Sequence, residues 1–184
     1  MSLPALRQIV ETVAVVVWVR HLIGAFRTFS PAQGERPSPF VYVFSLAVFV
    51  LVETVFRARL EARLVIPGLV AFIGSLVLFE WARRSVRGKF FSYIYSKDTP
   101  KFIWTSGPYA YIRNPFYASY MLSYIGAAMM FPGIPAFVVV AGMTVYFALA
   151  ARFEERKFKN SPLATEYEAY RRRTGRFIPR LGSA

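Results

Sequence analysis

The chain has 184 residues, a formal net charge of +13 at pH 7, and 55% hydrophobic side chains. This length suits one domain. A chain that is both apolar and strongly basic is typical of a membrane protein whose basic loops face the cytoplasm. Nucleic-acid binding would also explain the charge, but Lys and Arg lie between long apolar segments and form no single basic face, so we expect no nucleic-acid partner.

The composition also narrows the possible chemistry. The chain has no cysteine and one histidine, His21. Disulfides, thiolate metal sites and a Cys nucleophile are therefore excluded, and we expect no metal site. Neither a glycine-rich dinucleotide fingerprint nor a P-loop occurs in the sequence, so a cofactor would have to be held in another way.

Five apolar segments predict membrane-spanning helices, because each is close to the roughly 20 residues that cross a bilayer. Arg20 and His21 interrupt the first segment, so it could instead lie on the membrane surface. A signal peptide is a second alternative, but no A-x-A cleavage site follows the segment. We expect an all-α integral membrane protein with about five transmembrane helices, at residues 10–26, 39–56, 64–82, 115–131 and 133–151.

The last two segments predict a tight antiparallel hairpin, because only Pro132 and Gly133 separate them. Their outer ends lead into the two most basic regions, residues 83–114 with seven Lys/Arg and residues 152–180 with nine. The positive-inside rule places both regions in the cytoplasm. The loop at residues 57–63 then lies outside with three arginines, which conflicts with that rule.

A short cytoplasmic helix is expected at residues 162–173. Ser161 suits its N-cap, Pro162 its first position, and Gly175 the turn after its end. Residues 177–179 add an aromatic and apolar end to this tail.

Charged residues near the ends of the apolar segments are spaced for local ion pairs. Glu53 lies four residues before Arg57, and Glu80 lies four residues before Arg84, so each pair is expected on one helix face. We expect His21 at the membrane interface.

Two adjacent carboxylates, Glu154 and Glu155, end the fifth segment in the stretch AARFEERKFKN. They are unfavourable at a helix C-terminus, where the helix dipole is already negative. Two explanations remain open at this stage. The carboxylates could pair with nearby cations, since Glu155 and Lys159 have the right spacing, or they could bind a cationic ligand.

The stretch GPYAYIRNPFYASYMLSY, residues 107–124, places Arg113, Asn114 and Pro115 directly before the fourth apolar segment. Pro in the first turn of a helix loses no hydrogen bond. Arg113 and Asn114 would lie beside free backbone N–H groups at a positive dipole end, which suits a carboxylate or other anionic group. The alternative is an interfacial anchor with a snorkelling Arg and Tyr rings among the headgroups.

Three pieces in this order, TSGPYAYIRNPFYASYMLSYIG, ARFEERKF and EYEAYRRRTGRFIPR, resemble the isoprenylcysteine carboxyl methyltransferase and phospholipid N-methyltransferase superfamily of membrane enzymes. The resemblance covers residues 64–184, which we expect to be the methyltransferase core. Residues 1–63 carry no diagnostic motif and are expected to be N-terminal membrane helices on the substrate side. Many members have His at the position of Asn114, and Asn cannot titrate near neutrality.

The resemblance implies S-adenosylmethionine as cofactor, held without a Rossmann fold and covered by the C-terminal helix. It implies methyl transfer to a membrane lipid or lipidated substrate at the cytoplasmic interface. The acceptor would be an isoprenylcysteine carboxylate or a phosphatidylethanolamine-type amine that enters from the bilayer. The implied catalytic residues are Arg113 and Glu155. The implied cofactor site consists of Tyr109, Arg113, Asn114, Pro115, Tyr117, Glu154, Glu155, Tyr167, Tyr170, Arg176 and Pro179.

Two other classes of function are possible. The sterol reductases have a related C-terminal half and use NADPH, but they have more spans than this chain offers. A non-catalytic membrane scaffold or anionic-lipid binder would explain the charge and the spans, but it would leave Glu154 and Glu155 without a purpose.

Overall fold

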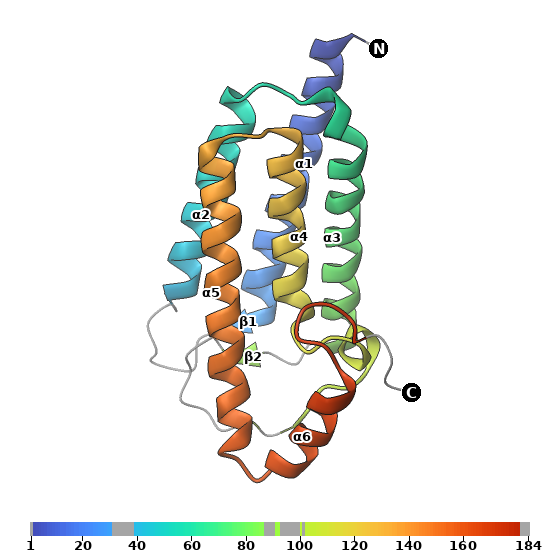
Figure 1. Ribbon diagram of the computed structural model, residues 1–184, viewed down its shortest axis with the longest axis vertical. Coiled ribbons are helices and arrows are strands. Elements are labelled where there is room, and N and C mark those ends of the chain that lie inside the picture. The colour runs from blue at the N-terminus through green and yellow to red at the C-terminus, as the bar shows by residue number, and fades with distance from the viewer. Residues whose placement is uncertain (1, 31–38, 87–90, 93–99, 101, 181–184) are drawn as a thin grey trace.

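Five long helices lie side by side in the computed structural model, which describes residues 2–30, 39–86, 91–92, 100 and 102–180 (Figure 1). All five apolar segments are helical, as the sequence predicts. The helices are α1 (Leu3–Thr28), α2 (Pro39–Arg57), α3 (Val65–Val86), α4 (Pro115–Met130) and α5 (Ile134–Lys159). A short helix, α6 (Ala164–Arg173), follows at one end of the bundle.

The remaining elements are short. Two 3₁₀ turns, η1 (Ala62–Leu64) and η2 (Gly107–Ala110), precede α3 and α4. Two strands of two residues each, β1 (Phe29–Ser30) and β2 (Phe91–Ser92), pair in parallel at the end of the bundle where α6 lies. The all-α fold class predicted from the sequence is therefore confirmed; within the described residues, this small pairing and an isolated β-bridge between Ile112 and Gly175 are the exceptions.

Helix α4 is the centre of the bundle, since it contacts α1, α2, α3 and α5. A helix that is buried on most faces must be apolar nearly all round, and α4 buries bulky side chains such as Tyr120, Tyr124 and Met130, while Ile125 is exposed. Its two buried serines satisfy their hydroxyls locally: Ser119 donates to the carbonyl of Phe116 (2.7 Å), and Ser123 donates in the same way one turn later.

Two glycines, Gly68 and Gly126, face each other in the contact between helices α3 and α4. A Cβ on Gly126 would lie 2.9 Å from the carbonyl oxygen of Gly68 and 3.2 Å from the Cβ of Ala71. Small residues at a helix crossing let backbones come close, which is how membrane helices gain packing energy without a hydrophobic driving force. This contact fixes the height of α4 relative to α3.

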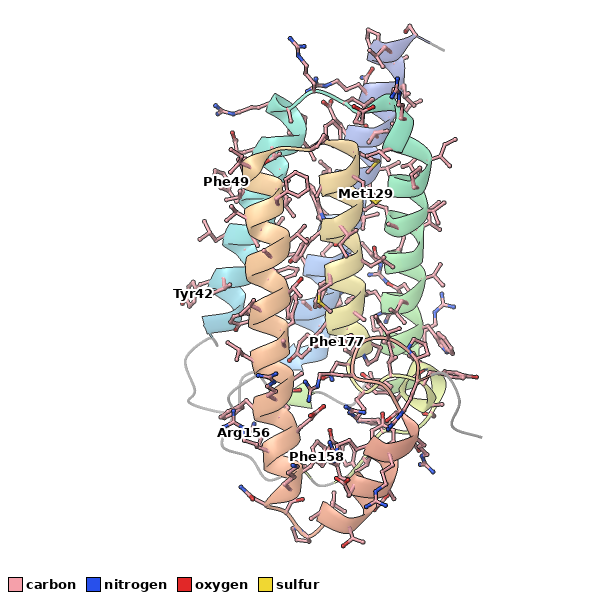
Figure 2. The ribbon with its side chains drawn as sticks, viewed as in Figure 1. Tyr42, Phe49, Met129, Arg156, Phe158 and Phe177 are labelled. Atoms are coloured by element: carbon pink, nitrogen blue, oxygen red, sulfur yellow. The ribbon has the colours of Figure 1, made fainter. Side chains whose placement is uncertain are left out.

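Three helices are long and apolar enough to cross a membrane, over Leu3–Ala25, Ala62–Val86 and Ile134–Lys159. Helices α2 and α4 are shorter, and their crossing of the bilayer stays a prediction. Apolar side chains point outward where lipid would lie, among them Tyr42 and Phe49 on α2 (Figure 2).

Helix α1 belongs to the bundle and does not lie apart from it. Val10, Ala14 and Trp18 are buried along its length. His21 is also buried within the bundle, with its ring edge-on to Phe79 at 4.7 Å between centroids, and its position at the membrane interface stays a prediction.

One predicted ion pair forms and the other does not. The Nε of Arg57 lies 2.6 Å from a carboxylate oxygen of Glu53, as expected. Glu80, however, pairs with Arg83 (2.7 Å) and with Arg20 of α1 instead of with Arg84. The charge of Arg20 within an apolar segment is thus neutralised by a neighbouring helix, which spacing along one helix cannot reveal.

The loop before α3 and the turn between α4 and α5 lie at one end of the bundle, and α6 lies at the other end. The backbone N–H of Glu61 donates to the carbonyl of Met130 (2.8 Å), so the loop before α3 and the α4–α5 turn lie together. The arginines of residues 57–63 are therefore at the end opposite α6. Helix α5 runs eight residues beyond its predicted end and carries Glu154 and Glu155 toward α6.

The start of α6 differs from the prediction. The helix begins at Ala164, and Pro162 precedes it instead of occupying its first position. Ser161 is not the N-cap: its hydroxyl donates to the carbonyl of Phe158 and accepts from the N–H of Leu163, which tightens the turn between α5 and α6. Gly175 follows the helix, as predicted.

The glycine contact between α3 and α4 can be tested by substitution. Gly126→Ala is expected to destabilise the protein by about 1–3 kcal/mol, because the added methyl overpacks the crossing. Gly142→Ala is the matched control, since a Cβ there meets nothing within 4 Å. Thermal unfolding in detergent micelles measures both, and an equal midpoint for the two variants would contradict the proposed role of the close approach.

Candidate functional site

The segment between η2 and α4 is held by the C-terminal tail. The N–H of Gly175 donates to the carbonyl of Tyr111 (3.0 Å), and the N–H of Arg113 donates to the carbonyl of Gly175 (2.9 Å). The N–H of Asn114 donates to the carbonyl of Arg176 (3.1 Å), and the Asn114 side-chain amide reaches the same oxygen (3.3 Å). These bonds join two segments that are about 60 residues apart in the sequence.

Gly175 is required for this junction by a close backbone approach. A Cβ at Gly175 would overlap the carbonyl oxygen of Ile178. The chain can therefore turn back over itself after α6 only with glycine at this position, and the turn presents Arg176 to the site.

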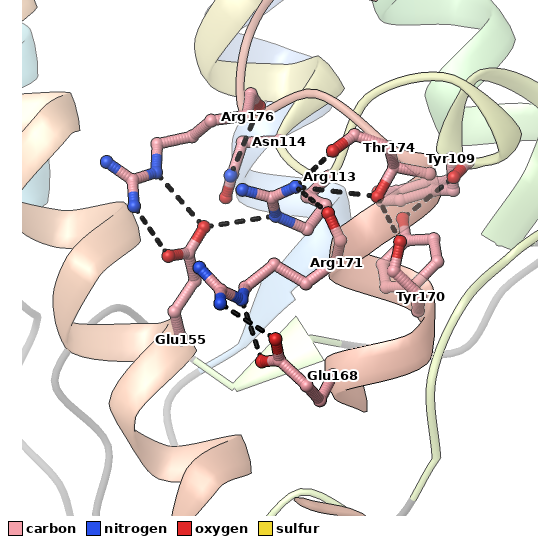
Figure 3. A network of polar contacts seen from close by, with 9 residues as sticks. All are labelled: Tyr109, Arg113, Asn114, Glu155, Glu168, Tyr170, Arg171, Thr174 and Arg176. Carbon is pink, nitrogen blue, oxygen red and sulfur yellow. Dashed lines mark hydrogen bonds and ion pairs between the residues drawn. The ribbon is translucent and has the colours of Figure 1, made fainter. Parts of the chain in front are cut away.

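Glu155 is the centre of a network of charged side chains, which Figure 3 shows. Its Oε1 accepts from the Nε of Arg113 (3.1 Å) and from the Nε of Arg176 (3.0 Å), and its Oε2 accepts from an Nη of Arg176 (2.7 Å). The side chains of Arg113 and Glu155 are each only 9% exposed. The hydrogen bonds that Arg176 donates to Glu155 raise the pKa of Arg176, so its guanidinium group stays charged.

Two of the alternatives that the sequence left open do not occur in the structure. Pairing of Glu155 with Lys159 does not form, because two arginines from other elements occupy the Glu155 oxygens. Arg113 does not snorkel toward headgroups, since it is enclosed in the network.

Thr174 belongs to this network and was not predicted from the sequence. One Nη of Arg113 donates to its backbone carbonyl and to that of Arg171 (3.2 Å). The Thr174 side chain is buried and donates to the carbonyl of Tyr170 (2.7 Å). Its position between the end of α6 and Gly175 could have indicated this role, because the last carbonyl groups of a helix have no partner within the helix.

Buried tyrosines join α6 to the rest of the site. The hydroxyl of Tyr170 donates to the carbonyl of Tyr109 (2.7 Å), and burial raises the pKa of Tyr170 to about 12, so the donor remains protonated. Tyr167 stacks on Phe158 of α5 with 4.3 Å between ring centroids. Phe158 lies on the part of α5 that faces α6 (Figure 2).

Glu154 lies in a different environment from its neighbour. Its Oε1 accepts a hydrogen bond from the hydroxyl of Tyr117 in the first part of α4 (2.8 Å). The ring of Tyr117 is buried and stacks on Phe147 of α5 at 5.0 Å. Adjacent residues on a helix point about 100° apart, so Glu154 and Glu155 present their carboxylates to different surroundings.

Most of the predicted site residues lie together. Tyr109, Arg113, Asn114, Glu155, Tyr170 and Arg176 are members of the network in Figure 3. Tyr117 and Glu154 form a hydrogen-bonded pair beside the network. Pro115 is buried at the start of α4, and Tyr167 is buried on α6. Pro179 is exposed beyond the turn, and none of the contacts within the described residues links it to the network.

The network still has free hydrogen-bond donors. One Nη of Arg113 and one Nη of Arg176 make no hydrogen bond within the described residues. Guanidinium donors beside a carboxylate match a ligand that carries both a carboxylate and an ammonium group. No group of three or more His, Asp or Glu side chains that could hold a metal ion occurs in the described part of the chain.

The fold and the polar network at one end of the bundle define a helical membrane protein with a charged site where α5 leaves the bundle. The family model described as phospholipid methyltransferase matches residues 62–162, more than half of the chain. The chain therefore belongs to the phospholipid methyltransferase family, within the superfamily that the sequence resembles. No curated protein matches the chain. This membership favours methyl transfer over the reductase and scaffold alternatives.

The dependence of the tail on Gly175 can be tested by proteolysis. Gly175→Ala is expected to release α6 from the site, so that trypsin cleaves faster after the arginines at residues 171–173. Gly133→Ala is the control, because the nearest atom to a Cβ there is 3.7 Å away. Equal cleavage rates in the two variants would contradict the account of the turn.

Proposed function

We propose that the protein transfers a methyl group from S-adenosylmethionine to a membrane lipid or lipidated acceptor at the cytoplasmic face of the bilayer. The observation that supports this most strongly is the network around Glu155. It joins the Arg-Asn-Pro segment, the end of α5 and the C-terminal tail, which are the three pieces that resemble the methyltransferase superfamily.

The residues present fit the cofactor's amino-acid portion. That portion carries a carboxylate and an ammonium group, and the site offers the free donor of Arg113 and the carboxylate of Glu155. Asn114 and Pro115 would line the same end of α4. The rings of Tyr117 and Tyr109 suit the sulfonium through cation–π attraction. When bound, the cofactor supplies an electrophilic methyl group.

The tail would cover the adenosine part of the cofactor. Tyr167 and Tyr170 on α6 offer ring surfaces, and Arg176 and Pro179 follow in the turn. Because Glu155 pairs with Arg113 and Arg176 in the structure, binding of the cofactor would exchange part of these ion pairs for contacts with the ligand.

The reaction needs no protein nucleophile, because the acceptor itself attacks the methyl group. The roles of this chain are to bind the two reactants, to align them and to exclude water, and alignment alone can supply about 7–11 kcal/mol of the barrier. Arg113 and Glu155 are the residues we assign to this alignment.

The acceptor would reach the site from the bilayer. The positive-inside rule favours a cytoplasmic location for the α6 end of the bundle, where the water-soluble cofactor would be available. We also propose that the chain has two parts. Residues 1–63 contribute α1 and α2 on the substrate side, and residues 64–184 form the methyltransferase core.

Methyl transfer into lipid vesicles tests the proposal. Arg113→Ala is expected to lower kcat/KM for S-adenosylmethionine about 100-fold, because a buried charge-assisted contact worth about 3 kcal/mol is lost. Arg172→Ala is the matched control: its side chain is 79% exposed, and among the described residues it pairs only with Glu168. Equal activity of the two variants, with labelled methyl groups counted in extracted lipid, would contradict the proposed site.

A further inference from the structure

We infer that the surface where α1 meets α3 holds an anionic phospholipid, bound through its phosphate by a cluster of arginines. This lipid is an accessory lipid and not a methyl acceptor. The inference goes beyond the proposed function and depends only on the location of the bundle in a membrane. The arginine cluster consists of Arg20 and Arg27 on α1 and Arg83 and Arg84 on α3.

The two helices that carry the arginine cluster contact each other, and both run toward the end of the bundle where α6 lies (Figure 1). They pack closely at Gly24, where an added Cβ would overlap the ring of Phe79. Arg20 lies about one turn before Gly24 and Arg27 about one turn after it. Residues seven apart share one face of a helix, about 10 Å apart along its axis, so both arginines lie along the same side of α1.

Glu80 neutralises only part of the charge of the cluster. It pairs with Arg20 and with one Nη of Arg83 (2.7 Å). The other two arginines of the cluster make no ion pair with any described residue. Residues 16–28 and 73–86 contain four arginines and one carboxylate, which leaves a net charge of +3. The side chains of Arg20 and Arg83 are 35% and 36% exposed, so guanidinium donors remain accessible beside the ion pairs.

An exposed apolar surface adjoins the arginine cluster. Val16 on α1 and Ile73 and Val77 on α3 are exposed. At about 100° per residue, they lie on the same sides of their helices as the arginines, one to three turns nearer the middle of the bundle. Trp81 is 45% exposed beside the cluster, and tryptophan rings are enriched where headgroups meet acyl chains. The arginines therefore lie at headgroup level, with a surface for acyl chains next to them.

A phospholipid with a net negative charge matches both surfaces. Guanidinium groups present their donors in a fork that fits phosphate oxygens, and basic pockets between membrane helices bind anionic headgroups. A zwitterionic lipid fits less well, because its ammonium group would meet a positive surface on which Glu80 is already held by two arginines. A water-soluble phosphate would leave the apolar surface without a partner.

The bound lipid would link α1 to α3, because arginines from both helices face its headgroup. A ligand that binds only the folded bundle stabilises it by mass action, so the lipid is expected to raise the unfolding temperature. The cluster shares no residue with the network around Glu155, and the effect of the lipid on stability therefore does not depend on a cofactor.

Thermal unfolding of the full-length protein in mixed micelles tests the inference. Phosphatidylglycerol is the anionic probe, and phosphatidylcholine with the same acyl chains is the zwitterionic one. Phosphatidylglycerol is expected to raise the unfolding midpoint of the wild type saturably, with little effect of phosphatidylcholine. Arg27→Gln and Arg84→Gln are each expected to raise the half-maximal phosphatidylglycerol concentration about fivefold, and the double variant about 25-fold. Both side chains are exposed and outside the Glu80 pairs, so these variants are expected to fold.

Arg172→Gln is the matched control, because it removes one positive charge from a side chain that is 79% exposed on α6, at the same end of the bundle. Its half-maximal concentration is expected to equal that of the wild type. The inference is overturned if this control weakens binding as much as Arg84→Gln does, or if the double variant responds to phosphatidylglycerol like the wild type. Equal stabilisation of the wild type by the two lipids would also contradict it.

Glycerol phosphate, which has no acyl chains, separates a lipid site from a site for free phosphate. It is expected to stabilise the wild type far less than phosphatidylglycerol at the same concentration. Equal stabilisation by the two compounds would assign the arginines to a soluble phosphate compound and contradict the proposed lipid.

Discussion

The buried carboxylate of Glu155 is the interaction on which the rest of the site depends. It accepts hydrogen bonds from Arg113, which precedes α4, and from Arg176 in the tail. Removing the charge of one partner from such a pair leaves an uncompensated buried charge, at a cost of about 3–5 kcal/mol. Together with the backbone hydrogen bonds between the tail and the segment before α4, this side chain at the end of α5 holds in one place three segments that are distant in the sequence.

The bundle positions this carboxylate through its central helix. Helix α4 is fixed against α3 by the contact of Gly126 with Gly68, and its first residue follows Arg113 and Asn114 directly. Helix α5 packs on α4 and continues past its start, so that Glu154 meets Tyr117 and Glu155 meets the tail. Helix packing in the apolar region and charge pairing outside it therefore act on the same few residues.

The sequence predicted the helices well because membrane helices depend on local apolar length, which is visible in the order of residues. The resemblance of three separate pieces also named most of the residues that lie together around Glu155, while their role in binding the cofactor stays a prediction. It could not predict contacts between distant segments: the pairing of Glu80 with Arg20, the burial of His21, and the two arginines on Glu155 all depend on the packing of separate helices. Thr174 was missed because its role lies in a backbone carbonyl, which any residue possesses.

Calorimetric titration of the detergent-purified wild-type protein with S-adenosylhomocysteine tests the central claim most directly. The account predicts saturable binding at about one molecule per chain, since the network around Glu155 offers one carboxylate and free guanidinium donors for one amino-acid group. Absence of binding by protein with a cooperative thermal transition would contradict the assignment of this network as the cofactor site.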